Sequence, residues 1–422
     1  MYPRLFLFIV FSFLLLLDSY VYQGVRVLTT SIQPTKRFTI HVTYWGFNTL
    51  LLGVILAKKP IGVGEQIKFI LPLCSVIYAT KLFMAFFLLL DDSTRGFRRI
   101  FSQADASPSG AEIARSAFLT KTGMVASLAL LLILGYGIIF GAYNYKLHRV
   151  KIKLPHLPSS FHGLRIGQIS DIHSGSCFNK AAFKAGVDLL LQEKPDLIFF
   201  TGDLVNNTAD EIHAYLDIFD KVQAPLGVYA ILGNHDYGDY VSWPSASARQ
   251  KNLQALCAAH QRLGWHLLRN EHVIITRGSG QLAVIGVENW GAGIFSKYGR
   301  LDQAYRDTEA VPVKLLLSHD PTHWDAQVRP RWPDIDITFS GHTHGFQVGL
   351  EVGDFKWSPL QYPFRYKQWA GLYQAGAQYL YVNRGYGNSS IYPGRIGIWP
   401  EITIIELEKA ERIGNSPKPA RT

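Results

Sequence analysis

The sequence predicts a membrane domain of four helices followed by a layered α/β domain, and three observations lead to this fold class. The 422 residues are enough for about two or three domains. Charged residues make up only 18% of the chain, whereas roughly 25% is usual in soluble proteins. Long apolar runs occupy the first third, and short runs rich in β-branched and aromatic residues alternate with helical patterns in the rest. The composition therefore excludes a disordered protein.

Four apolar runs predict the membrane domain, residues 1–149. They cover about residues 5–24, 38–57, 67–90 and 122–143, and each approaches the roughly 20 residues that a helix needs to cross a bilayer. One run of this length is also typical of a buried core helix, but four in succession favour membrane spans. The first run is followed by too many others to be a cleaved signal peptide. We therefore expect a multi-pass membrane protein.

Two charged residues interrupt these runs. Asp18 lies in the first run and Lys81 in the third. A charge inside a membrane is expensive and commonly functional. The alternative, which we prefer, is that both residues lie towards helix ends or pair with each other.

The distribution of basic residues leaves the membrane orientation open. The loops at 25–37 and 91–121 hold eight Lys and Arg residues, and the opposite side also holds eight, so the positive-inside rule gives a tie. Residues 114–121, followed by an apolar run, are similar to a twin-arginine export signal that has kept one arginine. On that basis we expect an inner-membrane protein whose large domain is extracytoplasmic.

Charge and cysteine content narrow the chemistry. Three cysteines without a CxxC pair exclude a disulfide scaffold and a thiolate zinc module. A net charge of +10 favours contact with anions such as lipid head groups, phosphates or nucleic acid.

Residues 150–408 show the pattern of a layered α/β fold. Helical patterns at 178–193, 209–222 and 247–263 lie between predicted strands, and the closer spacing of the last strands indicates an antiparallel portion. The predicted strands are 164–170, 197–201, 227–232, 282–287, 313–318, 335–340, 379–383 and 402–406. Residues 409–422, with four basic residues and two prolines, are expected to form a disordered basic tail.

Polar side chains follow five of these strands. They are Asp171 and His173; Asp203; Asn234, His235 and Asp236; His319; and His342 and His344. Ligands of open α/β sheets bind beyond the carboxyl ends of strands. Carboxylates, imidazoles and one amide, without a thiolate, suit divalent Mn, Fe, Co or Zn. One such motif arises by chance, but five in order predict a metal site.

These residues carry a resemblance to a known family. The motifs Asp171-Ile-His173, Gly202-Asp203, Gly233-Asn234-His235-Asp236, His319 and Gly341-His342-Thr343-His344 resemble those of the calcineurin-like metallophosphoesterase superfamily, and the resemblance covers about residues 160–408. More narrowly, the chain resembles the bacterial membrane-anchored branch, with domains similar to phosphodiesterases that cleave UDP-2,3-diacylglucosamine. The resemblance implies a four-layer α/β/β/α sandwich with two divalent metal ions. It implies that Asp171, His173 and His344 hold the first metal, that Asn234, His319 and His342 hold the second, and that Asp203 bridges them.

The resemblance also implies a mechanism. Two metals clamp a phosphate for in-line displacement, and His235 acts as general acid while Asp236 orients its ring. The alternative for His235 is that it only positions the substrate phosphate. Phe346, where many relatives have glycine or a smaller residue, is expected to narrow the mouth of the site.

The substrate is harder to read from the sequence. Residues 364–373 interleave cations with aromatics, a pattern found in single-stranded nucleic-acid binding, at membrane interfaces and in packed loops. Because four spans hold the domain at the bilayer, we expect a lipid-linked or nucleotide-sugar-lipid phosphodiester or pyrophosphate rather than nucleic acid. Two other classes stay open: a non-catalytic scaffold with the same fold, and a membrane sensor or transporter regulated by the hydrolase domain.

Overall fold

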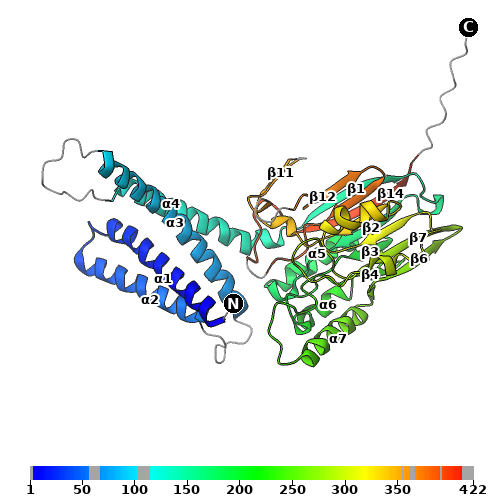
Figure 1. Ribbon diagram of the computed structural model, residues 1–422, viewed down its shortest axis with the longest axis horizontal. Coiled ribbons are helices and arrows are strands. Elements are labelled where there is room, and N and C mark those ends of the chain that lie inside the picture. The colour runs from blue at the N-terminus through cyan, green and yellow to red at the C-terminus, as the bar shows by residue number, and fades with distance from the viewer. Residues whose placement is uncertain are drawn as a thin grey trace, which may run out of the picture. The chain divides into compact units, whose positions relative to one another are not determined.

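The computed structural model describes residues 3–56, 67–101, 115–353, 355–361, 366–389 and 392–410. It divides into two compact units, Met1–Tyr136 and Gly137–Thr422 (Figure 1). The second unit therefore begins before residue 150, because the residues that end the last membrane helix pack on the α/β domain: the Gly137 carbonyl accepts a hydrogen bond from the backbone N–H of Arg395 at 3.0 Å. Most of the predicted tail, residues 411–422, lies outside the described residues.

Four long helices form the membrane part. They are α1 (Pro3–Leu28), α2 (Pro34–Leu56), α3 (Ile67–Phe101) and α4 (Ala117–Ile139). Each contains a stretch that is long and apolar enough to cross a membrane, so the prediction of four spans is confirmed. Large apolar side chains such as Phe8, Leu50 and Val125 are exposed on them, as expected for helices whose outer surface meets lipid rather than water.

Asp18 and Lys81, the charged residues that interrupt the apolar runs, pair with each other. Lys81 Nζ on α3 lies 2.6 Å from Asp18 Oδ1 on α1, and Asp18 is fully buried. The Tyr78 hydroxyl donates to the other Asp18 oxygen at 3.1 Å, and Lys81 also donates to Asn48 on α2. One polar network thus joins three helices, which agrees with the pairing expected from the sequence.

Two six-stranded sheets form the core of the second unit. The first has the order β1-β14-β2-β3-β4-β5, and the second has the order β12-β13-β9-β8-β7-β6. The strands of the first are β1 (Lys146–Leu154), β2 (Leu164–Ile169), β3 (Leu197–Phe200), β4 (Val228–Ala230), β5 (His266–Leu267) and β14 (Glu401–Lys409). Those of the second are β6 (Glu271–Arg277), β7 (Gly280–Gly286), β8 (Lys314–Leu317), β9 (Ile337–Ser340), β12 (Gly371–Ala375) and β13 (Gln378–Val382). A separate hairpin consists of β10 (Leu350–Val352) and β11 (Phe355–Trp357).

The helices of the second unit are mostly short. Residues 209–222, predicted as one helix, form a 3-10 turn and a short helix, because Thr208 and Glu211 cap the first turn separately. The α-helices are α5 (Lys180–Gln192), α6 (Leu216–Phe219), α7 (Ala246–Arg262), α8 (Leu301–Ala304) and α9 (Arg329–Arg331). The other short helices are of the 3-10 type, except for η6, which is a π-helix. They are η2 (Gly141–Tyr143), η3 (Ser159–Phe161), η4 (Ser174–Ser176), η5 (Ala209–Tyr215), η6 (Trp324–Val328) and η7 (His344–Phe346).

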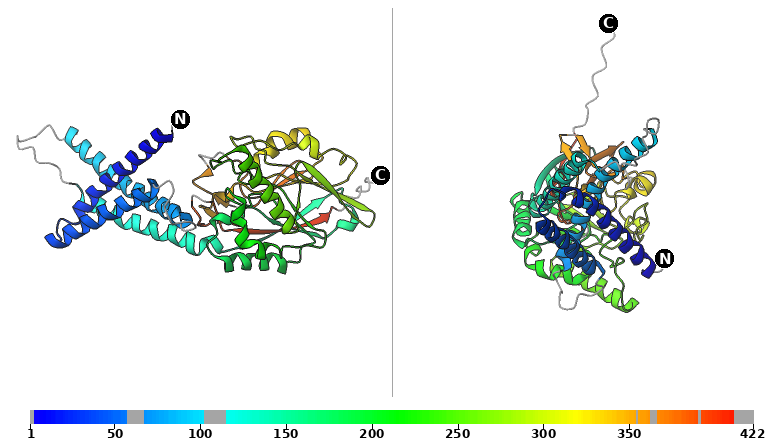
Figure 2. Two further views of the ribbon diagram at one scale, coloured as in Figure 1. Left: turned by 90° about the horizontal axis from the view of Figure 1, so that it is seen from below. Right: turned by 90° about the vertical axis from the view of Figure 1, so that its left-hand side faces the viewer.

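The buried side chains define four layers, α/β/β/α (Figure 2). Phe199 and Phe339, one from each sheet, meet at a ring distance of 4.9 Å in the core between the sheets. Helices α5 to α7 cover the outer face of the first sheet, and α8 and η6 cover that of the second. The sandwich is therefore closed on both sides, and its chemistry must lie at the ends of the strands.

Candidate metal centre

Five strand ends bring the predicted ligands to one edge of the sandwich. β2, β3 and β4 are adjacent and parallel in the first sheet, and β8 and β9 are adjacent and parallel in the second. Because the carboxyl ends of parallel strands meet at the same edge, the loops that follow these strands lie together. The backbone N–H of His342, after β9, donates to Asp171, after β2, at 2.9 Å. This contact joins the two sheets at the site.

Six of the seven predicted metal ligands form two sets. Asp171, His173 and His344 form one set, and Asp203, His319 and His342 form another, with the possible ligand atoms of each set within 4.8 Å of one another. A third group of the same kind joins Asp203 to His173 and His235. Asp203 Oδ2 lies 3.4 Å from His173 Nε2 and 3.1 Å from His319 Nε2. Asp203 therefore faces both sets, as a bridging carboxylate would.

Asn234 completes the second set. Its Oδ1 lies 3.1 Å from His319 Nε2 and 2.7 Å from His342 Nδ1. His319 Nδ1 lies 2.7 Å from the Thr201 carbonyl and so carries a hydrogen, which leaves Nε2 directed at Asn234 and Asp203. The amide oxygen and the imidazoles thus point at a common centre.

The chemistry of these side chains fits divalent metal ions. His173 Nε2 is buried, faces Asp203 Oδ2 at 3.4 Å and has no hydrogen-bond partner among the described residues. A buried ring nitrogen without a partner is costly in a folded protein. A cation at this centre would satisfy it, so the residues present fit the metal ions that the resemblance implies.

The backbone at the centre adopts an uncommon conformation. Asp171, His173, Asp203, His342 and His344 all have positive φ, between 45° and 70°. A non-glycine residue in this left-handed region costs of order 1–3 kcal/mol. Backbone strain at five of the predicted ligands indicates that the fold holds these side chains in place for function rather than for stability.

A glycine lets the ligand loops approach each other closely. A Cβ at Gly233 would lie 2.2 Å from Asp203 Oδ1, which no side chain tolerates. The same Oδ1 accepts the backbone N–H of His235 at 2.8 Å. The glycine of the Gly233-Asn234-His235-Asp236 motif is therefore needed for the packing of the Asp203 carboxylate.

Asp236 does not take the role expected from the sequence. Its carboxylate accepts the backbone N–H groups of Asp203 and Gly233, each at 2.9 Å, and those of the two residues after Asp203. The His235 ring is instead oriented by the Asn206 carbonyl, 2.8 Å from Nδ1. Asp236 thus organises the loop that carries Asp203, and the expectation that it orients the His235 ring is wrong.

Asn206 is a residue that the sequence analysis missed. Its side-chain oxygen lies 2.8 Å from His173 Nδ1, while its carbonyl accepts from His235. One residue therefore orients two histidines of the centre. Its place three residues after Asp203, in the loop that follows β3, was the available signal.

Burial and neighbouring charges shift the pKa values of the site. Burial raises the pKa of the Asp203 carboxyl, but the facing His319 reverses this and holds it well below its usual range. Burial lowers the pKa of His319, and the Asp203 charge overrides this and raises it to about 10. Burial lowers the pKa of His235 to about 4. Its Nδ1–H donates to Asn206, so neutral His235 keeps a free lone pair on Nε2.

Aromatic side chains surround the second set. The Tyr240 hydroxyl accepts from Asn234 Nδ2 at 2.8 Å, and the Tyr366 hydroxyl lies 2.7 Å from His342 Nε2. Phe346, expected to narrow the mouth, is buried and packs on Trp369 at a ring distance of 5.4 Å. Within the cationic-aromatic segment, residues 362–365 lie outside the described residues, and the described aromatics serve the site and its packing.

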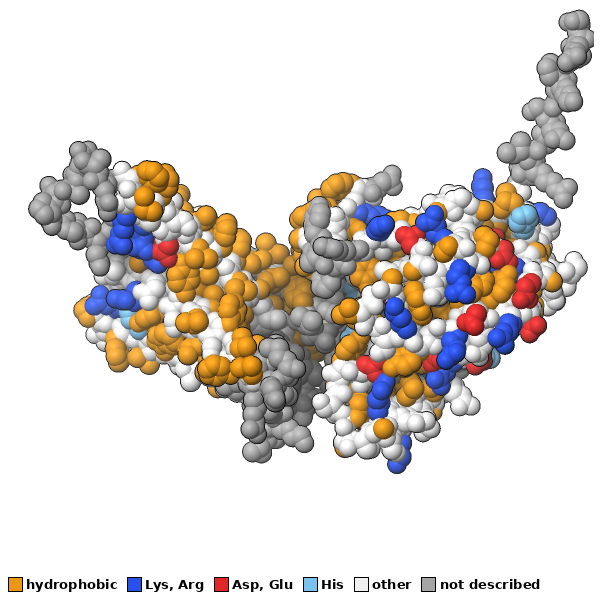
Figure 3. Space-filling view, viewed as in Figure 1, with side chains coloured by type: hydrophobic (Ala, Val, Ile, Leu, Met, Phe, Trp, Pro, Cys, Tyr) orange, Lys and Arg blue, Asp and Glu red, His pale blue; other side chains and the backbone are white. Residues whose placement is uncertain are grey.

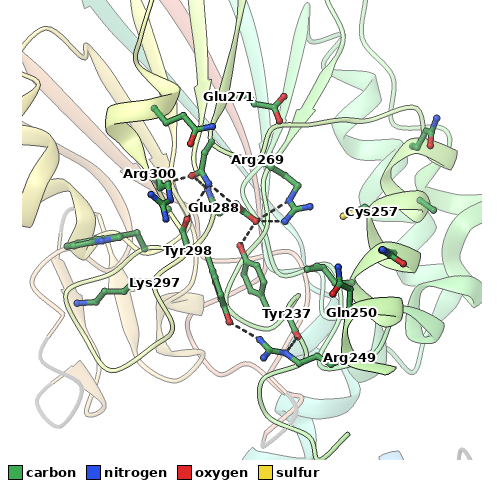
Figure 4. A pocket seen from close by; sticks show the side chains of 18 of the residues that line it. Tyr237, Arg249, Gln250, Cys257, Arg269, Glu271, Glu288, Lys297, Tyr298 and Arg300 are labelled. Carbon is green, nitrogen blue, oxygen red and sulfur yellow. Dashed lines mark hydrogen bonds and ion pairs between the residues drawn. The ribbon is translucent and has the colours of Figure 1, made fainter. Parts of the chain in front are cut away.

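A cavity of about 1390 Å³ lies beside α7 and the loop at 288–300 (Figure 4). None of the seven predicted ligands, all of them described, lines it. The charges at its centre are paired within the protein: Arg269 with Glu288, and Arg249 with Asp239. We therefore place the chemistry at the converging ligands.

Comparison with known proteins identifies the class that the fold and site define. Residues 164–346 match the family described as "Calcineurin-like phosphoesterase", and residues 3–142 match "Probable Calcineurin-like phosphoesterase, transmembrane domain". The chain is 31% identical to "Uncharacterized metallophosphoesterase YkuE" of Bacillus subtilis, over 62% of this chain and 84% of that protein. The chain therefore belongs to the calcineurin-like phosphoesterase family, and it is a membrane-anchored member.

Two further relatives, from Chlamydia muridarum and Danio rerio, are similar to more than half of this chain. The chain is 29% identical to "UDP-2,3-diacylglucosamine pyrophosphatase LpxG" of Chlamydia muridarum, over 57% of this chain and 83% of that protein. It is 28% identical to "Transmembrane protein with metallophosphoesterase domain" of Danio rerio, over 65% of this chain and 60% of that protein.

Proposed function

We propose that this protein hydrolyses a phosphodiester or pyrophosphate bond of a lipid-linked substrate at a centre of two divalent metal ions. The observation that carries the proposal is the position of Asp203 between two sets of ligands from five strand ends. Two cations held close together need a shared anion to reduce their repulsion. A single buried carboxylate facing both sets meets that need.

The ligands divide as the resemblance implies. Asp171, His173 and His344 would hold one ion, Asn234, His319 and His342 the other, and Asp203 would touch both. When bound, Mn, Fe, Zn or Co ions supply Lewis-acid activation of the phosphoryl group and of water. The neutral amide of Asn234 limits the negative charge of the centre and keeps it attractive to an anionic phosphoester.

His235 is the proposed proton donor to the leaving oxygen. The Asn206 carbonyl fixes its ring through Nδ1, so Nε2 is the atom available for proton transfer. The role requires a proton on Nε2 while the substrate is bound, and the negative charge of a phosphodiester favours the protonated ring. His235→Ala is expected to slow substrates with poor leaving groups far more than aryl esters.

The substrate class follows from the anchor and from one relative. Four membrane spans keep the domain at the bilayer. The relative from Chlamydia muridarum is named as a pyrophosphatase of UDP-2,3-diacylglucosamine, a nucleotide sugar that carries acyl chains. We place the protein in the inner membrane with its catalytic unit outside the cytoplasm, a side that the single-arginine segment at 114–121 supports.

Hydrolysis of an aryl phosphodiester by the full chain in detergent tests the proposal. Turnover is expected with Mn²⁺, and is expected to be lost with a chelator and in Asp203→Asn. Asp188→Asn is the matched control, because Asp188 is an exposed partner of Lys184 on α5. Bound metal without turnover of aryl or lipid phosphodiesters would favour the non-catalytic scaffold instead.

A further inference from the structure

The β10–β11 hairpin has its polar side facing inwards. Its register pairs Leu350 with Trp357, Glu351 with Lys356, and Val352 with Phe355. Since side chains alternate along a strand, the four apolar residues share one face and the charged pair occupies the other. The four apolar side chains are between 41% and 64% exposed.

The charged face holds the hairpin on the catalytic unit. Glu351 Oε2 accepts from Arg384 Nε at 3.0 Å, and Lys356 Nζ donates to the Ala370 carbonyl at 2.9 Å. Arg384 is buried and also pairs with Glu401. These contacts hold the charged face against the catalytic unit, so the apolar face of the hairpin points outwards. A sheet that faces water has the opposite arrangement, with polar side chains on its outer face.

The outer face forms a patch in the space-filling view, at the position that β11 occupies in Figure 1 (Figure 3). Contiguous exposed apolar side chains in a folded protein mark an interaction site. The occupant has to be mainly apolar, because the Trp357 indole N–H is the one hydrogen-bonding group among the four side chains.

The base of the hairpin lies next to the end of the last membrane span. Gly349 N–H donates to the Ile396 carbonyl at 2.9 Å, and the neighbouring Arg395 N–H donates to the Gly137 carbonyl at 3.0 Å. Gly137 is in the last turn of α4, within the candidate span Ala117–Tyr143. Ile396 thus contacts the hairpin, and its chain neighbour Arg395 contacts the end of the membrane helix.

We propose that the outer face of the β10–β11 hairpin docks into the lipid bilayer surface. An end of a membrane helix lies at the bilayer interface, and the hairpin begins beside that end. Aromatic and aliphatic side chains are typical of surfaces that enter the boundary between head groups and acyl chains. The partner is thus the lipid of the membrane in which the chain is anchored.

The docking has a consequence for the centre. The ligand His344 lies in η7, and after η7 the chain runs through Val348 and Gly349 directly into β10. A hairpin seated in the bilayer surface would keep the ligand loop close to the head groups. Resting on the proposed function, this assigns as substrate a phosphoester in the head group of a membrane lipid.

Fluorescent labelling of the full chain tests the docking itself. In a Cys257→Ser background, Val352→Cys carries an environment-sensitive label, and the chain is placed in bilayers of phosphatidylethanolamine and phosphatidylglycerol. The matched control is Ile274→Cys, an exposed apolar position on β6, at the edge of the second sheet opposite β12. The Val352 label is expected to be quenched by nitroxide-bearing lipid, and the Ile274 label by aqueous iodide.

Two results would overturn the docking proposal. Equal access of iodide to both labels would show that the hairpin stays in water. A Val352 label shielded from both quenchers would show that protein, from the same chain or a second copy, covers the hairpin.

A second experiment separates the docking from the proposed chemistry. Phe355→Glu is expected to lower turnover of a phosphodiester lipid in these bilayers roughly tenfold, as for the loss of one buried aromatic side chain. Turnover of a soluble aryl phosphodiester is expected to stay unchanged, and Phe355→Leu to restore lipid turnover. Equal losses on both substrates would contradict the consequence for the substrate. If the wild type cleaves neither ester, the proposed function fails, while the labelling result still decides the docking.

Discussion

The hydroxyl of Tyr366 lies 2.7 Å from Nε2 of His342. The other nitrogen of the same ring, Nδ1, faces Asn234 Oδ1 at 2.7 Å and is the atom directed at the second ligand set. The Tyr366 hydroxyl also reaches Asp320 Oδ2 at 3.4 Å. Tyr366 therefore fixes the ring orientation and the tautomer of a proposed metal ligand.

Replacing Tyr366 by Phe is expected to weaken metal binding. Outer partners of metal-binding histidines typically contribute about 10–100-fold to metal affinity, because they hold the ring in its binding orientation. The measurement is Mn²⁺ or Zn²⁺ binding to the metal-depleted full chain by calorimetry. Tyr379→Phe is the matched control, because Tyr379 is partly buried in the core between the sheets. Equal affinities for wild type and Tyr366→Phe would remove Tyr366 from the site.

Replacing Asp236 by Ala is expected to destabilise the fold. Its carboxylate accepts four backbone N–H groups in a buried loop. Leaving them without a partner costs roughly 1–3 kcal/mol each before relaxation, so we expect a loss of about 3 kcal/mol or more in the free energy of unfolding. Thermal unfolding of the metal-depleted chain measures it. An unchanged melting temperature would show that these four hydrogen bonds do not stabilise the loop.

The strands that the sequence predicted are the interior ones. The eight predicted runs correspond to β14, β2, β3 and β4 of the first sheet and β13, β9, β8 and β7 of the second. In the described part of the chain, the missed strands β1, β5, β6 and β12 all lie at sheet edges, and β10 and β11 form the separate hairpin. Interior strands covered on both faces read as continuous apolar runs. Edge strands such as β1, with the sequence KLHRVKIKL, mix charges with apolar residues and lose that signal.

The residues of the site also divide into those that the sequence predicted and those that it missed. Predicted ligands such as Asp171 and His342 stand in motifs at strand ends, so their positions could be predicted from the sequence. Asn206 and Tyr366 act through contacts between segments far apart in the chain: Asn206 is 33 residues from His173, and Tyr366 is 24 from His342. No spacing rule relates such pairs, and only the folded sandwich brings them together.

The Glu401–Arg384 pair is expected to make stability depend on acid pH. Burial alone would raise the pKa of the Glu401 carboxyl, but the Arg384 guanidinium beside it lowers the pKa from 4.5 to about 2. A carboxyl with a depressed pKa in the fold stabilises it above the unfolded value, and this contribution is lost as the pH falls from about 5 to 2. The difference in pKa corresponds to about 3 kcal/mol.

Glu401→Gln tests this dependence. At pH 7 the variant is expected to be less stable by about 3–5 kcal/mol, because Arg384 is left buried without its partner. Between pH 5 and 2 its melting temperature is expected to fall less steeply than that of the wild type, with both proteins kept in chelator. Parallel curves over this range would show that Glu401 does not carry the acid sensitivity.

The Asp18–Lys81 pair is expected to hold the membrane helices together. Removing one partner of a buried ion pair costs about 3–5 kcal/mol, because the other charge stays buried, whereas replacing both is often close to neutral. We therefore expect Asp18→Asn and Lys81→Met each to lower the melting temperature of the full chain in lipid nanodiscs, and the double variant to regain most of the loss. Hydrolysis of a soluble aryl phosphodiester by the folded variants is expected to match the wild type. Additive losses in the double variant would show that the two residues contribute separately, and loss of hydrolysis in folded single variants would link this network to the catalytic unit.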